Sequence, residues 1–393
     1  MKILDQLSLR LREPRQAPEK IDPPRHGVGN SIMETIQRAL SSAGLNAGSG
    51  PLSGVTHTIE KALSAAGLSR SEKVPGPDGP VMQTPASTGR MQQGEFISRS
   101  FTNGAGTRKY KLYVPRSYST HSSDEVPMVV MLHGCKQSPD DFAAGTQMNA
   151  LAEAHGFVVA YPAQAANANG SKCWNWFRSQ DQKREGGEPS IIAGITREVA
   201  GRYRIDRRRV YVAGLSAGAA MAVVLGATYP ELYAAVGAHS GLAYAAAHDV
   251  PSAFNAMKGS TAPAGVSAQF MRSSRQRPAA THSVPTIVFH GDSDSTVAAS
   301  NGEAIVEAMV GLAEQEALRV TTHEGATPGG RTYKRVVYAD IDENALVEHW
   351  VLHGAGHAWS GGSRSGSFTD PAGPDASAEM VRFFLAQKQA GTA

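Results

Sequence analysis

From Glu95 onward, short apolar runs alternate with longer stretches that have helical spacing. The apolar runs are continuous rather than alternating, which is typical of parallel strands covered on both faces. Two runs at 95–100 and 108–114, joined by a Gly-containing turn, indicate a hairpin. The pattern predicts an α/β fold: a mainly parallel sheet with helices on both faces and an antiparallel N-terminal edge hairpin. The other expected strands are 128–132, 157–161, 210–213, 233–239, 286–290 and 349–352, and the expected helices are 141–155, 190–203, 217–228 and 301–314.

Residues 1–92 follow a different pattern, rich in Pro, Gly, Ser and Ala. Within them, the segment 35–45 (TIQRALSSAGL) recurs at 58–68 as TIEKALSAAGL. Each copy spaces Ile and two Leu along one helical face and ends on a glycine suited to a helix C-cap. We expect a flexible N-terminal region with two short amphipathic helices, followed by one catalytic domain over 93–393. The repeat is either a tail with nascent helix or a docking element for a partner, lipid or polymer surface.

Charge, targeting signals and cysteine spacing argue against nucleic-acid binding, secretion, membrane insertion and a zinc site. The net charge of +3 comes from 38 basic and 35 acidic residues, so no electrostatic footprint for nucleic acid stands out. The first residues, 1–16, lack the apolar core of a secretory signal, and no 18-residue apolar stretch exists. We therefore expect no transmembrane segment and a cytoplasmic location. The two cysteines allow at most one internal disulfide, and no Cys/His spacing suggests zinc.

The pentapeptide Gly214-Leu-Ser-Ala-Gly218 fits the nucleophile-elbow pattern, in which a tight strand-to-helix turn exposes a serine hydroxyl. Because Gly and Ser are abundant in this chain, the match alone is weak evidence. Its context supports it: the motif follows the expected strand 210–213 and opens the expected helix 217–228. The sequence therefore predicts Ser216 as a nucleophile.

A serine hydroxyl needs a base to take its proton and a carboxylate to orient that base, in the chain order Ser, Asp, His. Asp294 follows the expected strand 286–290, and His357 follows the expected strand 349–352. Asp292 competes with Asp294, and we favour Asp294 because it matches the HGxxD pattern of α/β-hydrolases. The predicted triad is Ser216, His357 and Asp294.

Acyl transfer also needs donors aimed at the developing oxyanion. Such donors are usually the backbone N–H after the nucleophile, here Ala217, and one from the loop after the third strand. That loop follows the expected strand 128–132, which makes the N–H of Cys135 the second candidate. This chemistry implies no metal and no organic cofactor.

Six segments in order extend the pattern: LHGCKQ (132–137), CWNWF (173–177), GLSAG (214–218), HGDSDSTV (290–297), GAGHAWSGG (354–362) and FTDPAGPDAS (368–377). With them, the chain resembles the poly(3-hydroxybutyrate) depolymerase family of esterases, close to feruloyl and acetylxylan esterases of the same fold. The resemblance covers about residues 95–387. It implies an α/β-hydrolase fold, the triad Ser216, Asp294 and His357, and an oxyanion hole from Cys135 and Ala217.

The resemblance also implies a disulfide between Cys135 and Cys173 near the site. A disulfide fits a reducing cytoplasm poorly, so an export route not displayed by the sequence stays an alternative. In such proteins Trp174, Trp176 and Trp359 flank the cleft and offer flat apolar faces to the substrate. Core packing is an equal alternative for Trp174 and Trp176, whereas we favour a substrate contact for Trp359.

The predicted function is a serine ester hydrolase acting on poly- or oligo(3-hydroxybutyrate)-type and short-chain esters. Without a polymer-binding domain after Phe384, soluble oligomers, granules or small esters are expected rather than crystalline extracellular polyester. The expected partners are the ester substrate and a granule surface reached through residues 1–92. One alternative is a feruloyl or acetylxylan esterase. Another is a non-catalytic granule- or partner-binding protein on a hydrolase scaffold.

Overall fold

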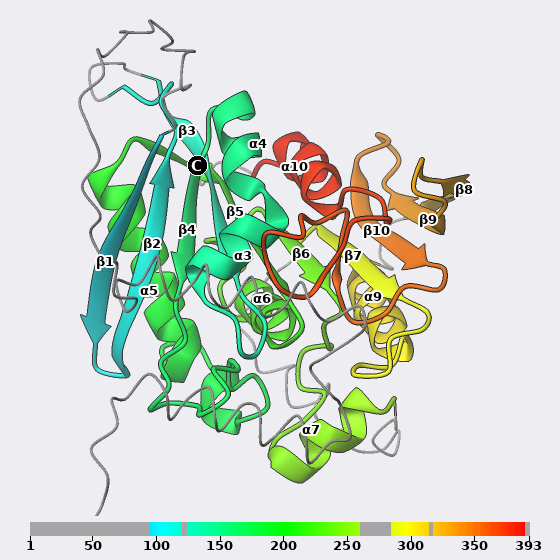
Figure 1. Cartoon of the computed structure of the whole chain (residues 1–393), viewed down its shortest axis with the longest axis horizontal. Coiled ribbons are helices and arrows are strands. Elements are labelled where there is room, and N and C mark those ends of the chain that lie inside the picture. The colour runs from blue at the N-terminus through cyan, green and yellow to red at the C-terminus, as the bar shows by residue number, and fades with distance from the viewer. Residues whose placement is uncertain (1–93, 120–123, 260–283, 314–316, 390–393) are drawn as a thin grey trace, which may run out of the picture. The chain divides into compact units, whose positions relative to one another are not determined.

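The computed structural model describes residues 94–119, 124–259, 284–313 and 317–389. Within them lies a ten-stranded sheet (Figure 1). Its strands are β1 (Glu95–Asn103), β2 (Gly106–Val114), β3 (Val126–Leu132), β4 (Val158–Pro162), β5 (Ile205–Leu215), β6 (Ala235–His239), β7 (Thr286–Gly291), β8 (Arg319–Ala326), β9 (Thr332–Ala339) and β10 (Ala345–Leu352).

The strand order is β1-β2-β4-β3-β5-β6-β7-β10-β9-β8. All pairings from β4 to β10 are parallel. At one edge β1, β2 and β4 pair antiparallel, which confirms the predicted N-terminal hairpin. At the other edge β10, β9 and β8 also pair antiparallel. Because the six central strands run the same way, their carboxyl ends and the loops that follow lie at one edge of the sheet.

Helices cover both faces of this sheet, as the pattern of continuous apolar strands predicted (Figure 1). One face packs on side chains such as Phe142, Met148 and Phe383, and the other on Ile192 and Met221. The first set of helices is α3 (Pro139–Thr146), α4 (Met148–His155) and α10 (Ala376–Ala386), and the second is α5 (Gly187–Arg202), α6 (Ala217–Thr228) and α9 (Ser300–Ala313).

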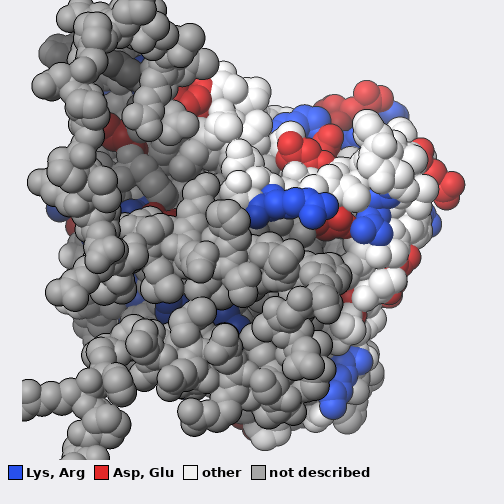
Figure 2. Space-filling view, viewed as in Figure 1, with Lys and Arg blue, Asp and Glu red and all other residues white. Residues whose placement is uncertain are grey.

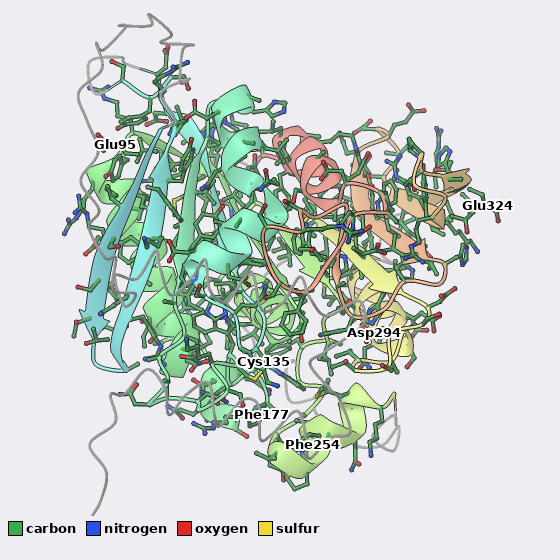
Figure 3. All side chains as sticks on the ribbon, in the orientation of Figure 1. Glu95, Cys135, Phe177, Phe254, Asp294 and Glu324 are labelled. Carbon is green, nitrogen blue, oxygen red and sulfur yellow. A yellow bond between two sulfur atoms is a disulfide. The ribbon has the colours of Figure 1, made fainter. Side chains whose placement is uncertain are left out.

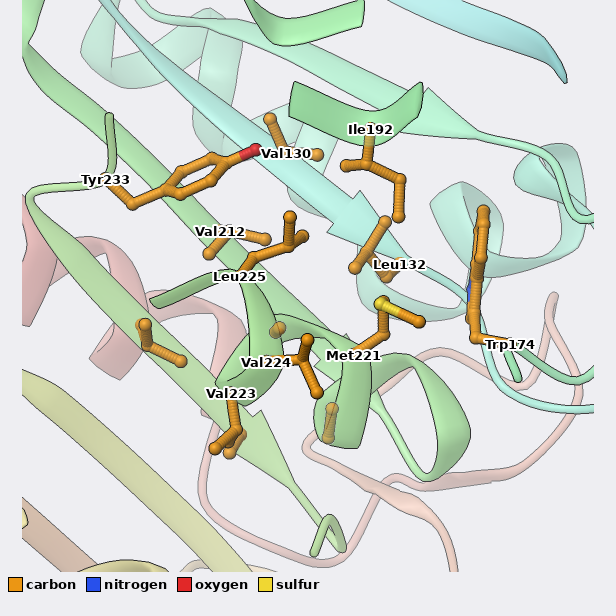
Figure 4. Packing of buried hydrophobic residues seen from close by; sticks show 14 of the residues in the cluster. Val130, Leu132, Trp174, Ile192, Val212, Met221, Val223, Val224, Leu225 and Tyr233 are labelled. Atoms are coloured by element: carbon orange, nitrogen blue, oxygen red, sulfur yellow. The ribbon is translucent and has the colours of Figure 1, made fainter. Parts of the chain in front are cut away.

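The core beneath α6 shows how strands and helix interlock (Figure 4). Val130 and Val212 of adjacent strands face Met221 and Leu225 of the helix, and all four are buried. Each such side chain contributes about 1.5–3 kcal/mol by leaving water. This packing fixes the start of α6, where Ser216 lies, against the carboxyl ends of the central strands.

Several features of the fold were not predicted, α10 among them, and two have a clear physical cause. The stretch expected to form one helix over 141–155 is two, because Gln147 adopts a left-handed conformation with φ of 56°. Its backbone N–H and its side-chain amide donate to the carbonyls of Ala143 and Ala144, which ends α3. The hairpin of β8 and β9 was also missed, because nearly every residue of β8 is exposed and no apolar period marks it. The remaining elements are η1 (Ser179–Gln182), α7 (Val250–Met257), β11 (Trp359–Ser360) and β12 (Thr369–Asp370).

The predicted N-terminal region, 1–92, with its two helical repeats, lies outside the described residues. Among the described helices, none combines the length and apolar character needed to cross a bilayer. On the described part of the face in Figure 2, acidic and basic side chains lie next to one another rather than in separate fields.

Candidate active site

Ser216 occupies a strained turn between β5 and α6. Its φ of 57° and ψ of −120° lie outside the regions that a side-chain-bearing residue prefers, at a cost of about 1–3 kcal/mol. Two backbone hydrogen bonds hold the turn: the N–H of Ser216 donates to the carbonyl of His239, and its carbonyl accepts from Ala220, both at 2.9 Å. The turn therefore presents the serine at the carboxyl end of a central strand, as the elbow motif predicted.

The two glycines of the motif are required by close backbone contact. A Cβ on Gly218 would overlap the carbonyl oxygen of Leu132, at the end of β3. A Cβ on Gly214 would overlap the backbone of Gly218 itself. The elbow thus lies directly against the segment that leads into the loop containing Cys135.

That loop contains Cys135, whose backbone N–H is the second predicted oxyanion donor. In the described part of the chain, the backbone N–H groups of Cys135 and Ala217 donate to no other protein group. The loop is held by its own contacts: Gln137 accepts from the N–H of Gly134 at 2.9 Å, and Lys136 donates to the carbonyl of Ser171 at 2.7 Å. Two free donors on a fixed backbone can stabilise an oxyanion placed between them.

A disulfide joins Cys135 to Cys173, with an S–S distance of 2.07 Å, which confirms the predicted pairing. Next to it, the indole of Trp174 donates to the carbonyl of His133 at 3.1 Å. Burial lowers the pKa of His133 to about 4, so this imidazole is neutral and accepts from the N–H of Gln164 at 3.1 Å. The candidate oxyanion loop is therefore fastened covalently and by hydrogen bonds to the loop that follows β4.

Asp294 and His357 are brought together by the loops after β7 and β10. The Nδ1 of His357 lies 2.7 Å from Oδ2 of Asp294, whose side chain is fully buried. The other carboxylate oxygen accepts from the N–H groups of Thr296 and Val297 at 2.9 Å each. Burial raises the pKa of Asp294, but the hydrogen bond from His357 and those two amides outweigh it and leave the pKa below its ordinary value. The carboxylate therefore stays ionised and fixes the tautomer that leaves Nε2 of His357 free as a base.

Asp292, the competing acid, has a different partner. Its Oδ2 lies 2.9 Å from Nδ1 of His353, and its Oδ1 accepts from Gly354. Both side chains of this pair are substantially exposed. The structure thus pairs Asp294, not Asp292, with the predicted base His357.

His239 links the elbow to the loop that carries His357. Its carbonyl accepts from the N–H of Ser216, and its Nε2 accepts from the N–H of Ser360 at 3.0 Å. The ring stacks against Phe289 and Trp359 and is fully buried, and burial lowers its pKa to about 3. A neutral histidine here holds both loops in register. The sequence placed it at a strand end but gave no signal for this role.

His290 supports the acid from the other side. Its Nε2 donates to the carbonyl of Val297 at 2.9 Å and lies 3.6 Å from Oδ2 of Asp294. Burial lowers the pKa of His290, so the ring remains uncharged beside the carboxylate. The turn that holds Asp294 is therefore closed by the histidine of the same HGxxD motif.

The tryptophans predicted to contact substrate are core residues. Trp174 is 0% and Trp359 is 1% exposed, and Trp176 is also buried. The indole of Trp359 donates to Ser377 at 3.0 Å, and its ring packs against Phe142. A side chain without an exposed face offers none to a substrate, so the expectation for Trp174 and Trp359 is corrected: both support the loops from within.

The predicted residues thus gather at one edge of the sheet, where Figure 3 labels Cys135 and Asp294. The loop after β7 touches the loop after β10, since Ser293 donates to the carbonyl of Ala355 at 3.1 Å. Among the described residues, no group of three or more His, Cys, Asp or Glu side chains is arranged to hold a metal ion. The arrangement offers a serine, an oriented base and two amide donors, which are the parts of an acyl-transfer site.

Comparison with known proteins places this site in a family. Poly(3-hydroxyalkanoate) depolymerase C from Paucimonas lemoignei is 34% identical over 266 residues, covering 66% of this chain and 60% of that protein. Feruloyl esterase B from Neurospora crassa is 28% identical over 281 residues, covering 69% of this chain and 90% of that protein.

A solved structure supports the fold. Acetyl xylan esterase from Aspergillus awamori superposes with a TM-score of 0.59 at 19% identity, over 74% of this chain and 99% of its own. The chain spans less than two thirds of the depolymerase's length, although it covers nearly all of the feruloyl esterase. Residues 108–330, more than half of the chain, match the family described as "Esterase PHB depolymerase". The chain therefore belongs to the esterase PHB depolymerase family.

Proposed function

We propose that this protein is a serine ester hydrolase that works through an acyl-enzyme on Ser216. The observation that carries the proposal is the buried pair of Asp294 and His357 at the sheet edge that also holds the strained serine elbow. Asp294 accepts the Nδ1–H of His357, which leaves the Nε2 lone pair to take a proton. Free amides at Cys135 and Ala217 complete the set of groups that ester hydrolysis needs.

The first half-reaction forms the acyl-enzyme. Nε2 of His357 removes the proton from Oγ of Ser216 as Oγ attacks the ester carbonyl carbon. The carbonyl oxygen becomes an oxyanion and accepts from the N–H groups of Cys135 and Ala217. The carbonyl re-forms, the C–O bond to the alcohol breaks, and the leaving alkoxide takes the proton from Nε2. Asp294 stays ionised and stabilises the imidazolium between these steps.

The second half-reaction releases the acid. Water gives a proton to His357 as its oxygen attacks the acyl carbon, and the same two amides hold the second oxyanion. Collapse breaks the bond to Oγ of Ser216, which recovers its proton from Nε2. The products are a carboxylic acid and an alcohol, and the enzyme returns to its starting state.

For the substrate, we propose poly- or oligo(3-hydroxybutyrate)-type and short-chain esters. The support is the 34% identity to a poly(3-hydroxyalkanoate) depolymerase. A second candidate, a feruloyl ester, is favoured by a relative named feruloyl esterase of which the chain covers 90%. Initial rates on 3-hydroxybutyrate trimer, p-nitrophenyl butyrate and methyl ferulate separate the two. Trimer cleavage at least tenfold more efficient than ferulate cleavage supports the first, and the reverse order supports the second.

Ser216→Ala tests the activity itself. Turnover of p-nitrophenyl butyrate should fall by about a thousandfold or more, because the nucleophile is gone, while the thermal midpoint changes little. Ser365→Ala, at an exposed serine, is the matched control and should keep wild-type rates. A phosphonate ester should label the wild type but not Ser216→Ala. Full activity in Ser216→Ala would overturn the assignment, and absence of both activity and labelling in the wild type would favour a non-catalytic binding protein.

A further inference from the structure

A cavity separate from the serine site opens at the same edge of the sheet. It has a volume of about 680 Å³ and contains none of the residues assigned to catalysis. Three segments form it: the β1–β2 turn, the loop after β4 and the start of α5. Its polar lining consists mainly of Arg108, Asn167, Asn175, Arg178, Asp181 and Glu188.

The sheet topology places this cavity on the same side of the sheet as the serine site. β4 is separated from β5 only by β3, so the two strand ends lie about 10 Å apart at the usual strand spacing. Asn175 is also two residues from Cys173, which is bonded to the candidate oxyanion loop at Cys135. A ligand in the cavity would therefore lie on the same side of the sheet as Ser216 without contacting the residues assigned to catalysis.

Several polar groups of the lining already have protein partners. Arg108 donates to Glu188 at 3.1 Å and to Gln164 at 2.9 Å, and all three side chains are buried. Glu188 also accepts from the backbone and side chain of Asn175, at 2.7 and 2.8 Å. Because Arg108 and Glu188 are paired with each other, they shape the cavity. The other polar groups of the lining, those of Asn167, Arg178 and Asp181, are the ones that could hydrogen-bond to a ligand.

Asp181 is the exception in the lining. It is only 7% exposed, and its Oδ1 accepts from the N–H of Glu188 at 2.7 Å. Its Oδ2 has no hydrogen-bond partner among the described residues, although the residue borders the cavity. Burial raises the pKa of Asp181 to about 6, and the nearby Glu188 adds to the rise, while Arg178 and Arg108 oppose it. This Oδ2 is not one of the fully buried atoms without a partner, so it is open to the cavity and can accept a hydrogen bond from a ligand there.

The remaining lining defines the chemistry of that ligand. Its two arginines and two carboxylates balance in charge, and its only apolar side chains are those of Ala105 and Ala168. An acyl chain or an aromatic ring would find little apolar surface there, and an ion would meet both signs of charge. Asn167 and Arg178 are exposed and add hydrogen-bonding groups at the rim.

We propose that this cavity binds a neutral polyhydroxylated ligand, a saccharide unit. One hydroxyl donates to Oδ2 of Asp181, and others accept from Arg178 and from the side-chain amide of Asn167. The site stands on residues that take no part in ester hydrolysis, so its existence does not depend on the proposed function. If the saccharide site and the proposed ester hydrolysis are both correct, the cavity would bind the sugar part of a glycan-linked ester on the same side of the sheet as Ser216.

The experiment is a calorimetric titration of the full chain with xylobiose, cellobiose and maltose, none of which carries an ester. At least one should bind. Asp181→Asn keeps an oxygen for the N–H of Glu188 but replaces the free acceptor by a donor, so it should weaken binding by about tenfold. Arg178→Ala should weaken binding severalfold, and Arg207→Ala, at an exposed arginine of β5, should leave it unchanged.

The outcomes separate clearly. Saccharide binding that Asp181→Asn and Arg178→Ala weaken, and Arg207→Ala does not, supports the site. Absence of binding by all three saccharides overturns it, as does binding that neither cavity variant changes. If Asp181→Asn lowers the thermal midpoint strongly, the exposed Arg178→Ala decides alone. Because the readout is heat of binding and not turnover, the result holds whether or not Ser216 hydrolyses esters.

Discussion

Two Asp–His pairs lie side by side at the catalytic edge, built by the same two loops. Asp294 binds His357 and Asp292 binds His353, with Oδ2–Nδ1 distances of 2.7 and 2.9 Å. Their surroundings differ. The side chains of Asp294 and His357 are 0% and 13% exposed, whereas those of Asp292 and His353 are 39% and 46% exposed.

The comparison teaches that environment, not the hydrogen bond itself, separates a pair suited to catalysis from a surface contact. Water competes for the exposed pair, so its strength is about 0–1 kcal/mol. The buried carboxylate is instead fixed by two backbone amides and a neighbouring neutral His290, in a medium where charge interactions are stronger. The buried pair therefore has the stronger constraint on the orientation of its imidazole.

The largest expected effect comes from breaking the buried pair, with the exposed pair as the control. Asp294→Asn should lower kcat/KM for p-nitrophenyl butyrate by about a thousandfold to ten-thousandfold, because the amide no longer fixes the tautomer or stabilises the imidazolium. Asp292→Asn, the matched control, should stay within about twofold of wild type. Equal losses in the two variants would contradict the distinction drawn between the pairs.

A smaller effect is expected in the pH dependence of stability. The pKa of Asp294 is lowered in the folded state, so its contribution to stability is complete above the ordinary value of 3.8 and is lost as the pH falls through the lower folded value. The difference in unfolding free energy between wild type and Asp294→Asn should therefore shrink as the solution is acidified below about pH 5. Urea unfolding at several pH values measures it, and parallel curves for the two proteins would count against the ionised, buried carboxylate.

The smallest expected effect is a change in stability when the exposed pair is broken. Asp292→Asn should destabilise the fold by no more than about 1 kcal/mol, since an amide oxygen can still accept from Gly354. Raising the salt concentration to about 1 M should remove most of this difference by screening. Thermal midpoints of wild type and Asp292→Asn at low and high salt give the answer. A larger loss, insensitive to salt, would mean that this pair too is structural.

Much of the catalytic edge could be predicted because it depends on local pattern. Helix α6 was predicted over its full length, 217–228, since a continuous apolar stretch follows a glycine-flanked serine. The disulfide came with the resemblance, through the segments around Cys135 and Cys173. Short-range rules are sufficient where a strand, a tight turn and a buried helix follow one another in the chain.

The remainder depended on contacts between distant segments. Trp359 looks in sequence like a residue beside the catalytic histidine, yet its ring is enclosed by Phe142 and His239 from other elements. Strand β8 is polar on both faces and pairs only through its backbone, so no hydrophobic period reveals it. The cavity at Asp181 likewise joins the β1–β2 turn to segments far along the chain. Such arrangements follow from tertiary packing, which a single sequence does not display.

The crowding at Gly214 and Gly218 also bears on how this protein can change over generations. A single methyl group at either position would collide with backbone, and backbone cannot rotate away as a side chain can. Any substitution of these two glycines is therefore expected to disrupt the turn, whichever ester the enzyme hydrolyses. Divergence toward new substrates must therefore proceed through the loops that surround the serine, while the turn beneath them is inherited unchanged.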